Sequence, residues 1–450
     1  MSVAGGAAGD PAVFYCQPRR GQTGKRERGG DAGRRNRVSG TAGTSLLAPF
    51  RVRSFRFQWP ADLATSWAFE METLILGWFV LVETGSVVLL TAFGSLQFFG
   101  ALIAPMFGVI GDRIGFRNQL CLMRASYAML ALVLTAFAFA GTLGAVHVFV
   151  IATICGLVRP SDLVMRNALI GQTMPADQLM GAMGVSRTTS DSARIAGSLA
   201  GAGLVATFGM GPAYVAITLF YLLSLGLTLG VAGKRTGLAT ARVSPWRDLA
   251  EGIGYVWTTP RLLAAMWLAF LVNLTAFPLS GGLLPFVAKD VYGMGQAGLG
   301  TLAASFAFGA LLGSITVTAR GAAIRPARVM IVSSLAWHSL LLVFAQSDHA
   351  ATGIVILMLA GFMQSLCMIP LAVMLLRNAA DRFRGRVMGV RMLAIYSMPI
   401  GLLAAGVLIG RIGFAATASI YCVTGLVFTL CIAVHWRAEL WRRDAPANAR

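Results

Sequence analysis

The sequence predicts an all-α polytopic membrane protein with twelve transmembrane helices. Hydrophobic residues make up 56% of the 450 residues and charged residues only 12%, whereas soluble proteins contain about 25% charged residues. The mean hydropathy is +0.71. Twelve apolar stretches are close to the roughly 20 residues that a helix needs to cross a bilayer. They cover residues 57–82, 87–110, 118–141, 145–169, 178–208, 212–232, 261–286, 296–317, 327–345, 351–376, 383–410 and 414–436.

The distribution of Lys and Arg predicts the orientation of these helices, because basic residues are retained in the short cytoplasmic loops of membrane proteins. Lys and Arg cluster in alternate loops and in both terminal segments, whereas the loops at 83–86, 141–146 and 209–211 contain none. Lys289 and Arg411 are the exceptions on the outer side. We therefore expect a multi-pass protein of the inner (plasma) membrane with both termini in the cytoplasm.

Residues 1–56 form a Gly- and Arg-rich segment that we expect to be a disordered N-terminal tail. Residues 1–58 contain 11 Lys or Arg against 3 Asp or Glu, and cytoplasmic loops supply most of the remaining net charge of +19. Nucleic acid is therefore not an expected partner. The tail lacks the apolar core of a signal peptide. Either the true start lies further along the chain, or the tail is attracted to anionic lipid.

Residues 233–260 are polar and predict a cytoplasmic linker that contains one amphipathic helix. The helix is expected to start at Ser244-Pro245, with Asp248 and Glu251 in its first turns, where carboxylates suit the helix dipole. Residues 437–450 are expected to form a cytoplasmic C-terminal tail.

An internal repeat relates the two halves of the chain, 57–232 and 261–436. The matching residues lie about 205 positions apart, and such a long period indicates a duplication of six helices. The matches are Ala176-Asp177 with Ala380-Asp381, Met183-Gly184-Val185 with Met388-Gly389-Val390, and Gly209 with Gly413.

Two charged motifs rich in glycine carry a family resemblance. Gly108-Val-Ile-Gly-Asp112-Arg113-Ile-Gly115-Phe-Arg117 joins the second and third apolar stretches, and Arg384-Gly385-Arg386-Val387-Met388-Gly389 precedes the eleventh helix. The first resembles the loop signature of the major facilitator superfamily. The second resembles a signature of the third drug:proton antiporter group of that superfamily, which includes enterobactin exporter-like proteins. The resemblance covers about residues 55–436.

The resemblance implies two six-helix bundles around a central cavity, alternating access by rocking of the halves, and export as the direction. It also implies a conformational latch, in which Asp112 lies near the start of the eleventh helix and its helix dipole. Arg113 or Arg117 would pair with Asp162 at the cytoplasmic end of the fourth helix. Alternatively, these arginines only anchor a solvated loop at the membrane surface.

Two departures from the family pattern bear on the mechanism that the resemblance implies. Related antiporters have Gly-Pro in the fifth helix, where this chain has Gly197-Ser198. The second-half copy of the loop motif contains Ala319-Arg320 and lacks the acidic residue. The acidic contact of the latch is therefore expected from Asp112 alone.

Glu70 and Glu72 lie about 20 Å into the first predicted helix at 1.5 Å per residue, close to the bilayer midplane. A carboxylate at that depth costs at least about 2.5–3.5 kcal/mol, so it normally faces a cavity or a partner and often carries protons. The two side chains diverge by about 160–200° around the helix. We expect one to face the cavity as a proton or cation site and the other to pair with a neighbouring helix. Alternatively, both belong to structural ion pairs.

Arg187, Asp191 and Arg194 form one charged stripe on the fifth helix, spaced so that they share a face. This stripe either neutralises itself or contains an arginine that exchanges partners among Asp191, Glu70 and Glu72 when a proton arrives. Arg159, beside Pro160 on the fourth helix, is a further cavity candidate.

The sequence contains no Walker motif, nucleophile elbow or metal-ligand spacing, so we expect neither an enzyme nor a metal or cofactor site. The proton gradient would be the energy source. The expected partners are a small-molecule substrate, protons and membrane lipids, and the chain is expected to be monomeric.

The sequence thus predicts a secondary active transporter that exports a hydrophobic or amphiphilic small molecule in exchange for protons, an efflux antiporter. The mid-membrane carboxylates favour cationic substrates. A siderophore or lipid cargo is the first alternative. A membrane sensor that uses the same scaffold without transport is the second.

Overall fold

The structure is a computed structural model that describes residues 48–102, 114–232, 245–320, 325–380 and 383–441. These residues belong to one compact unit. Every secondary-structure element in the described ranges is helical. The all-α fold that the sequence predicts is therefore confirmed.

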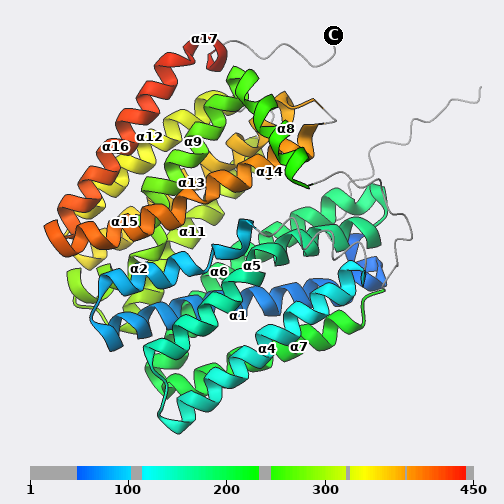
Figure 1. Cartoon of the computed structure of the whole chain (residues 1–450), viewed down its shortest axis with the longest axis vertical. Helices are drawn as coiled ribbons and strands as arrows, with labels where there is room; N and C mark the ends of the chain where they lie inside the picture. Colours follow the sequence, from blue (N-terminus) through cyan, green and yellow to red (C-terminus); the bar gives the residue numbers. More distant parts are fainter. Residues whose placement is uncertain (1–47, 103–113, 233–244, 321–324, 381–382, 442–450) are drawn as a thin grey trace, which may run out of the picture. The chain divides into compact units, whose positions relative to one another are not determined.

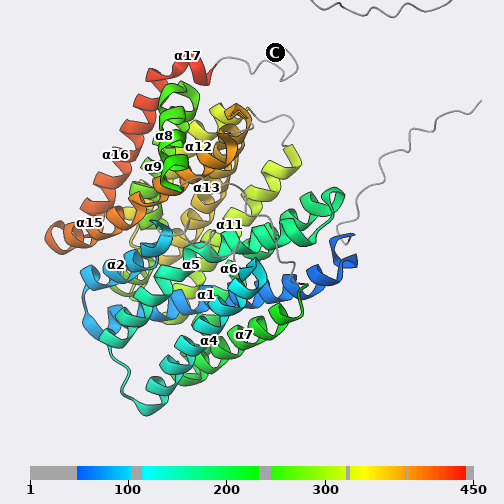
Figure 2. The ribbon, with the colours of Figure 1, turned by 45° about the vertical axis from the view of Figure 1, so that its right-hand side comes forward.

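The first half contains the helices drawn from blue to green in Figure 1. The helix α4 packs against α7, and the two lie side by side in both Figure 1 and Figure 2. The elements of this half are the 3-10 turn η1 (Ala48–Arg51), α1 (Arg53–Thr84), α2 (Val87–Leu96), the 3-10 turn η2 (Phe99–Leu102), α4 (Phe116–Ala140), α5 (Ala145–Thr173), α6 (Ala176–Phe208) and α7 (Met210–Leu229).

The second half begins with the linker helix α8 (Pro245–Thr258) and repeats the six-helix plan. Two of its spans are built from consecutive pieces, since η3, α10 and η4 continue α9, and α15 continues α14. The elements are α9 (Pro260–Phe277), η3 (Pro278–Gly282), α10 (Leu284–Phe286), η4 (Val287–Val291), α11 (Gln296–Arg320), α12 (Pro326–Ala345), α13 (Ala350–Asn378), α14 (Arg384–Ile395), α15 (Ser397–Ile412), α16 (Phe414–His435) and α17 (Arg437–Leu440).

Ten helices or continuous helical stretches in the described ranges are long and apolar enough to cross a membrane. The two remaining predicted spans fall short for identifiable reasons. Helix α2 has ten residues, and the part of its predicted span at 103–110 lies outside the described residues. Helix α6 has 33 residues but carries the charged stripe that lowers its hydropathy. The chain is a multi-pass membrane protein.

The internal repeat has a counterpart in the backbone at Gly209 and Gly413. Gly209 ends α6 and precedes α7, and Gly413 occupies the same place between α15 and α16. Their φ angles are 83° and 82°. Residues with a side chain rarely adopt this conformation, so glycine is required at both sharp turns.

Glycines also allow pairs of helices to approach closely within each half. In the first half, a Cβ on Gly201 would lie 2.9 Å from the Cα of Met71, so α6 packs directly on the backbone of α1. In the second half, a Cβ on Gly309 would overlap the carbonyl oxygen of Met358, so α11 packs on the backbone of α13. Small residues have this role in membrane helices because close approach of backbones maximises van der Waals contact.

The two halves contact each other through α2 with α15 and through α6 with α11. The Ser95 hydroxyl donates a hydrogen bond of 3.1 Å to the carbonyl oxygen of Pro399. A Cβ on Gly300 of α11 would overlap that of Ala202 on α6. These contacts position the helices that line the candidate site.

Replacing Gly309 by Ala is expected to lower the stability of the folded protein by about 1–3 kcal/mol, because the added methyl group forces α11 away from α13. Gly410→Ala is the matched control, since a Cβ there meets no neighbouring atom within 4 Å. Thermal unfolding of the purified protein in detergent measures both. Equal Tm values for the two variants would show that the α11–α13 contact does not need glycine.

Candidate functional site

A cavity of about 460 Å³ lies between helices of the two halves. This volume is within the range of small-molecule pockets, about 300–1,000 Å³. Of the described residues that line the cavity, two are charged, Glu70 and Arg194, and both belong to the first half. The second half contributes apolar side chains, glycines and the polar residues Asn273 and Ser280. Among the described residues, no group of three His, Cys, Asp or Glu side chains is placed to hold a metal ion.

Glu70 on α1 and Arg194 on α6 form an ion pair at the wall of this cavity. Arg194 Nε lies 3.7 Å from Glu70 Oε1, and each side chain is about one-third exposed, 38% for Arg194 and 34% for Glu70. Gly197 allows the approach, because a Cβ at that position would lie only 2.8 Å from the Cβ of Glu70. The ion pair is therefore accessible from the cavity, and its atoms are too far apart for a short hydrogen bond.

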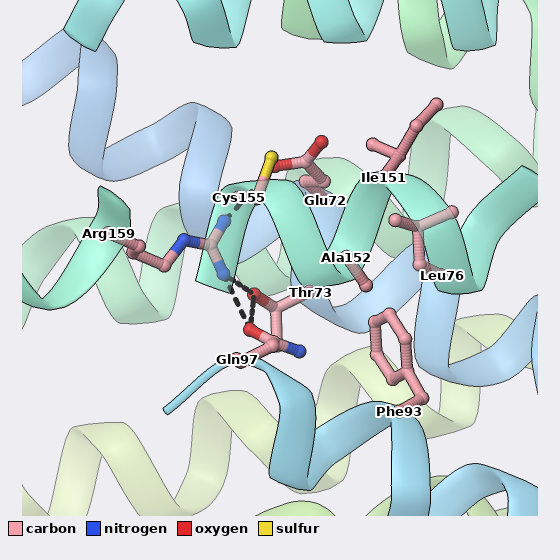
Figure 3. A pocket seen from close by; sticks show the side chains of 9 residues that line it. All are labelled: Glu72, Thr73, Leu76, Phe93, Gln97, Ile151, Ala152, Cys155 and Arg159. Atoms are coloured by element: carbon pink, nitrogen blue, oxygen red, sulfur yellow. Dashed lines mark hydrogen bonds and ion pairs between the residues drawn. The ribbon is translucent and has the colours of Figure 1, made fainter. Parts of the chain in front are cut away.

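Glu72 points to the opposite side of α1 and lies in a buried polar cluster, shown in Figure 3. Arg159 Nη2 on α5 lies 3.0 Å from Glu72 Oε2, and the Tyr221 hydroxyl on α7 donates to the same oxygen at 2.8 Å. The Arg159 guanidinium also lies 4.1 Å from the centroid of the Phe69 ring, a cation–π contact. The two carboxylates thus have different environments, one in the cavity wall and one in the helix packing.

The polar side chains of Thr73 and Gln97 connect the Glu72 cluster to the cavity. Arg159 Nη1 donates to Gln97 Oε1 at 2.5 Å and to Thr73 Oγ1 at 2.8 Å, as Figure 3 shows. Both acceptors line the cavity and also a void of about 10 Å³ beside Glu72. A void of this size is at the lower limit for one water molecule. A single layer of side chains therefore separates the buried carboxylate from the cavity.

A second buried charge cluster was not predicted from the sequence. It contains Asp62 on α1, Arg124 on α4, and Asp162 and Arg166 on α5, all at most 5% exposed. Asp62 pairs with Arg124, and Arg166 pairs with both Asp62 and Asp162. Two carboxylates and two guanidinium groups balance, so the cluster is neutral. The signals that could have revealed it are the i, i+4 spacing of Asp162 and Arg166 and the presence of Asp62 and Arg124 inside apolar stretches.

The predicted latch is only partly within the described residues. Gly108, Asp112 and Arg113 lie outside them. Gly115 has a φ of 88° and precedes α4, so the turn requires glycine there. The expected partner of Asp162 is Arg113 or Arg117, and the pairing with Arg113 stays a prediction. Arg117 donates instead to the Val231 carbonyl oxygen at 3.3 Å and to Asn118 Oδ1 at 3.2 Å. Asp162 pairs instead with Arg166, one helical turn away.

The charged residues of the predicted stripe on α6 do not share one environment. The side chain of Arg187 lies outside the described part of the structure. Asp191 is buried, with 6% exposure. Arg194 faces the cavity and pairs with Glu70 across the helix interface.

The second-half signature lies at the start of α14, against the linker helix α8. Arg386 Nη1 lies 2.9 Å from Glu251 Oε2, and the Tyr255 ring stacks on Phe383 with centroids 4.3 Å apart. Arg384 Nε donates to the Leu376 carbonyl oxygen at 3.2 Å. A Cβ on Gly385 or Gly389 would meet no neighbouring atom within 4 Å, so the described contacts do not explain either glycine.

An all-helical membrane fold of two repeated halves with a cavity between them is the architecture of a secondary transporter. The sequence matches the Major Facilitator Superfamily over residues 59–399, about three-quarters of the chain. The protein belongs to this superfamily. A comparison with curated proteins finds no significant match.

Solved transporter structures share the fold at low sequence identity. A POT family transporter in complex with 5-aminolevulinic acid has a TM-score of 0.68 and 13% identity, covering 87% of this chain and 97% of that one. The nucleoside transporter NupG has a TM-score of 0.65 and 13% identity, covering 84% and 99%. A bacterial homologue of the human lysosomal transporter Spinster, in an inward-facing and unoccupied conformation, has a TM-score of 0.64 and 13% identity, covering 87% and 99%.

Replacing Asp62 by Asn is expected to destabilise the protein by about 3–5 kcal/mol, because it leaves buried Arg124 without a compensating charge. The double variant Asp62→Asn/Arg124→Met removes both charges of that pair and should recover part of the loss. Thermal unfolding in detergent measures both, with Glu83→Gln, at an exposed position near the end of α1, as the control. A wild-type Tm for Asp62→Asn would exclude a stabilising role for the pair.

Proposed function

We propose that this protein is a proton-coupled exporter of amphiphilic small molecules that works by alternating access. The proposal rests mainly on the buried Glu72–Arg159 pair, which is separated from the central cavity by Thr73 and Gln97. A carboxylate buried in a membrane protein and paired with a cation is a typical proton-carrying site. Export rests on the resemblance of residues 384–389 to the drug:proton antiporter signature.

Protonation of Glu72 changes the balance of charge at Arg159. While Glu72 is ionised, Arg159 has a carboxylate on one side and two neutral acceptors, Thr73 and Gln97, on the other. A proton on Glu72 removes the attraction between opposite charges, so Arg159 interacts mainly with Thr73 and Gln97. Because these two side chains line the cavity, the proton alters the surface that a substrate meets.

The same change reaches the contact between the halves through α2. Gln97 directly follows α2, and α2 packs against α15 of the second half. Ser95, two residues before Gln97, donates to Pro399 across that interface. A shift of Gln97 with Arg159 therefore biases the packing of α2 on α15. This bias is the step by which protonation favours one orientation of the halves over the other.

Glu72→Gln tests the coupling, because it keeps the shape of the side chain and removes its ability to ionise. Reconstituted in proteoliposomes, the wild-type protein is expected to move the fluorescent lipophilic cation ethidium against its gradient when a pH gradient is imposed. In Glu72→Gln the stimulation by the pH gradient should fall by about 5- to 150-fold, the range of a coupling free energy of about 1–3 kcal/mol.

Glu83→Gln makes the same chemical change at an exposed position and should leave transport unchanged. Undiminished stimulation in Glu72→Gln would exclude Glu72 as the coupling site. Ethidium binding by folded wild-type protein without any gradient-driven flux would favour the membrane sensor instead.

A further inference from the structure

The cavity wall has one acidic and one basic side chain among the described residues, and the two lie next to each other. Glu70 and Arg194 lie together on the first-half wall, and the described second-half wall has no charged side chain. The two polar side chains of that wall already bond within their own helices. Asn273 Nδ2 donates to the Ala269 carbonyl oxygen at 2.8 Å, and the Ser280 hydroxyl donates to that of Ala276 at 2.9 Å.

Resting on the proposed function, we infer that the cavity selects zwitterionic amphiphiles. The cationic group of the ligand binds Glu70, its anionic group binds Arg194, and its apolar body lies against the second-half wall. That wall includes Phe277, Phe306 and Met368. Methionine and aromatic side chains adapt to apolar bodies of different shapes.

The Glu70–Arg194 pair is open enough to exchange its partners for a ligand. Its atoms are 3.7 Å apart, whereas a charge-assisted hydrogen bond is about 2.7–2.9 Å long. By contrast, the Glu72–Arg159 pair is 3.0 Å apart, with side chains that are 6% and 16% exposed. The cavity pair therefore loses little direct hydrogen bonding when a ligand separates it.

The combination of charges predicts that a single-charge ligand binds, but less tightly than a zwitterion. A cation that binds Glu70 leaves Arg194 without its countercharge in a confined cavity, and an anion that binds Arg194 does the same to Glu70. An uncompensated charge away from bulk water is costly. A zwitterion supplies both countercharges at once, so the complex stays neutral and each group has a partner.

The test uses three fluorescent probes that share one dansyl-decyl body and differ only in the head group. The heads are a carboxymethyl-dimethylammonium betaine, a trimethylammonium and a carboxylate. Dissociation constants are measured on the full-length protein in lipid nanodiscs. The wild-type protein is expected to bind the betaine about tenfold more tightly than either single-charge probe, a difference of about 1.4 kcal/mol.

The variants Glu70→Gln and Arg194→Gln should change the preference in opposite directions. Glu70→Gln leaves Arg194 and should favour the carboxylate probe, whereas Arg194→Gln leaves Glu70 and should favour the trimethylammonium probe. The double variant Glu70→Gln/Arg194→Gln should bind all three probes with affinities within about twofold. Thermal unfolding of each variant verifies that it is folded, and Arg411→Gln, at an exposed helix end, is the control.

If both single variants keep the wild-type order of affinities, the inference is overturned, even when pH-driven ethidium transport is intact. If the preferences change as expected but no gradient drives transport, the head-group site stands and the proposed function fails. Binding and flux therefore separate the two proposals.

Discussion

The neutralisation of buried charge is the constraint on which the first half of this protein depends. Charged side chains placed among apolar helices are costly unless each finds a countercharge. Asp62, Arg124, Asp162 and Arg166 balance one another, and Glu72 balances Arg159. These pairs connect α1 to α4 and α5, so the helices cannot rotate or slide independently without exposing an unpaired charge.

The second half is held together differently. Its buried polar side chains in the described residues are uncharged or histidine. One of them, His338, interacts with Thr275 Oγ1 at 2.9 Å and with the Ser334 carbonyl oxygen at 2.8 Å. Glycines on α11 and α13 bring those helices into backbone contact, and Trp337 is fully buried in the core. Close packing is less directional than ion pairing, because it depends on shape and not on particular charged partners. The two halves therefore share a six-helix plan but are stabilised differently, the first by buried ion pairs and the second mainly by close packing of helices.

The sequence predicted the fold well because span length and glycine turns are local properties. Apolar stretches and the positions of Gly209 and Gly413 need no knowledge of contacts between distant residues. The divergence of Glu70 and Glu72 around α1 was likewise predictable from helix geometry. Their partners were not, since Glu72 and Arg159 are 87 positions apart and meet only through the packing of α1 on α5. Asp62 and Arg124 were missed for the same reason. For Asp162 the sequence predicted Arg113 or Arg117 as the partner, whereas Arg166, one turn away on the same helix, pairs with it.

Helix α1 connects the proposed proton site to the proposed head-group site. Glu72 and Glu70 are two residues apart and face opposite sides of the same helix, one toward Arg159 and the other toward Arg194. Gly197 and Gly201 hold α6 directly against this part of α1. A rotation of α1 that loosens one pair therefore moves the other, because the helix between them is rigid and its neighbour is in contact. Both ion pairs that are proposed to change partners thus lie in one half, and the apolar wall of the other half can move past them without separating either pair.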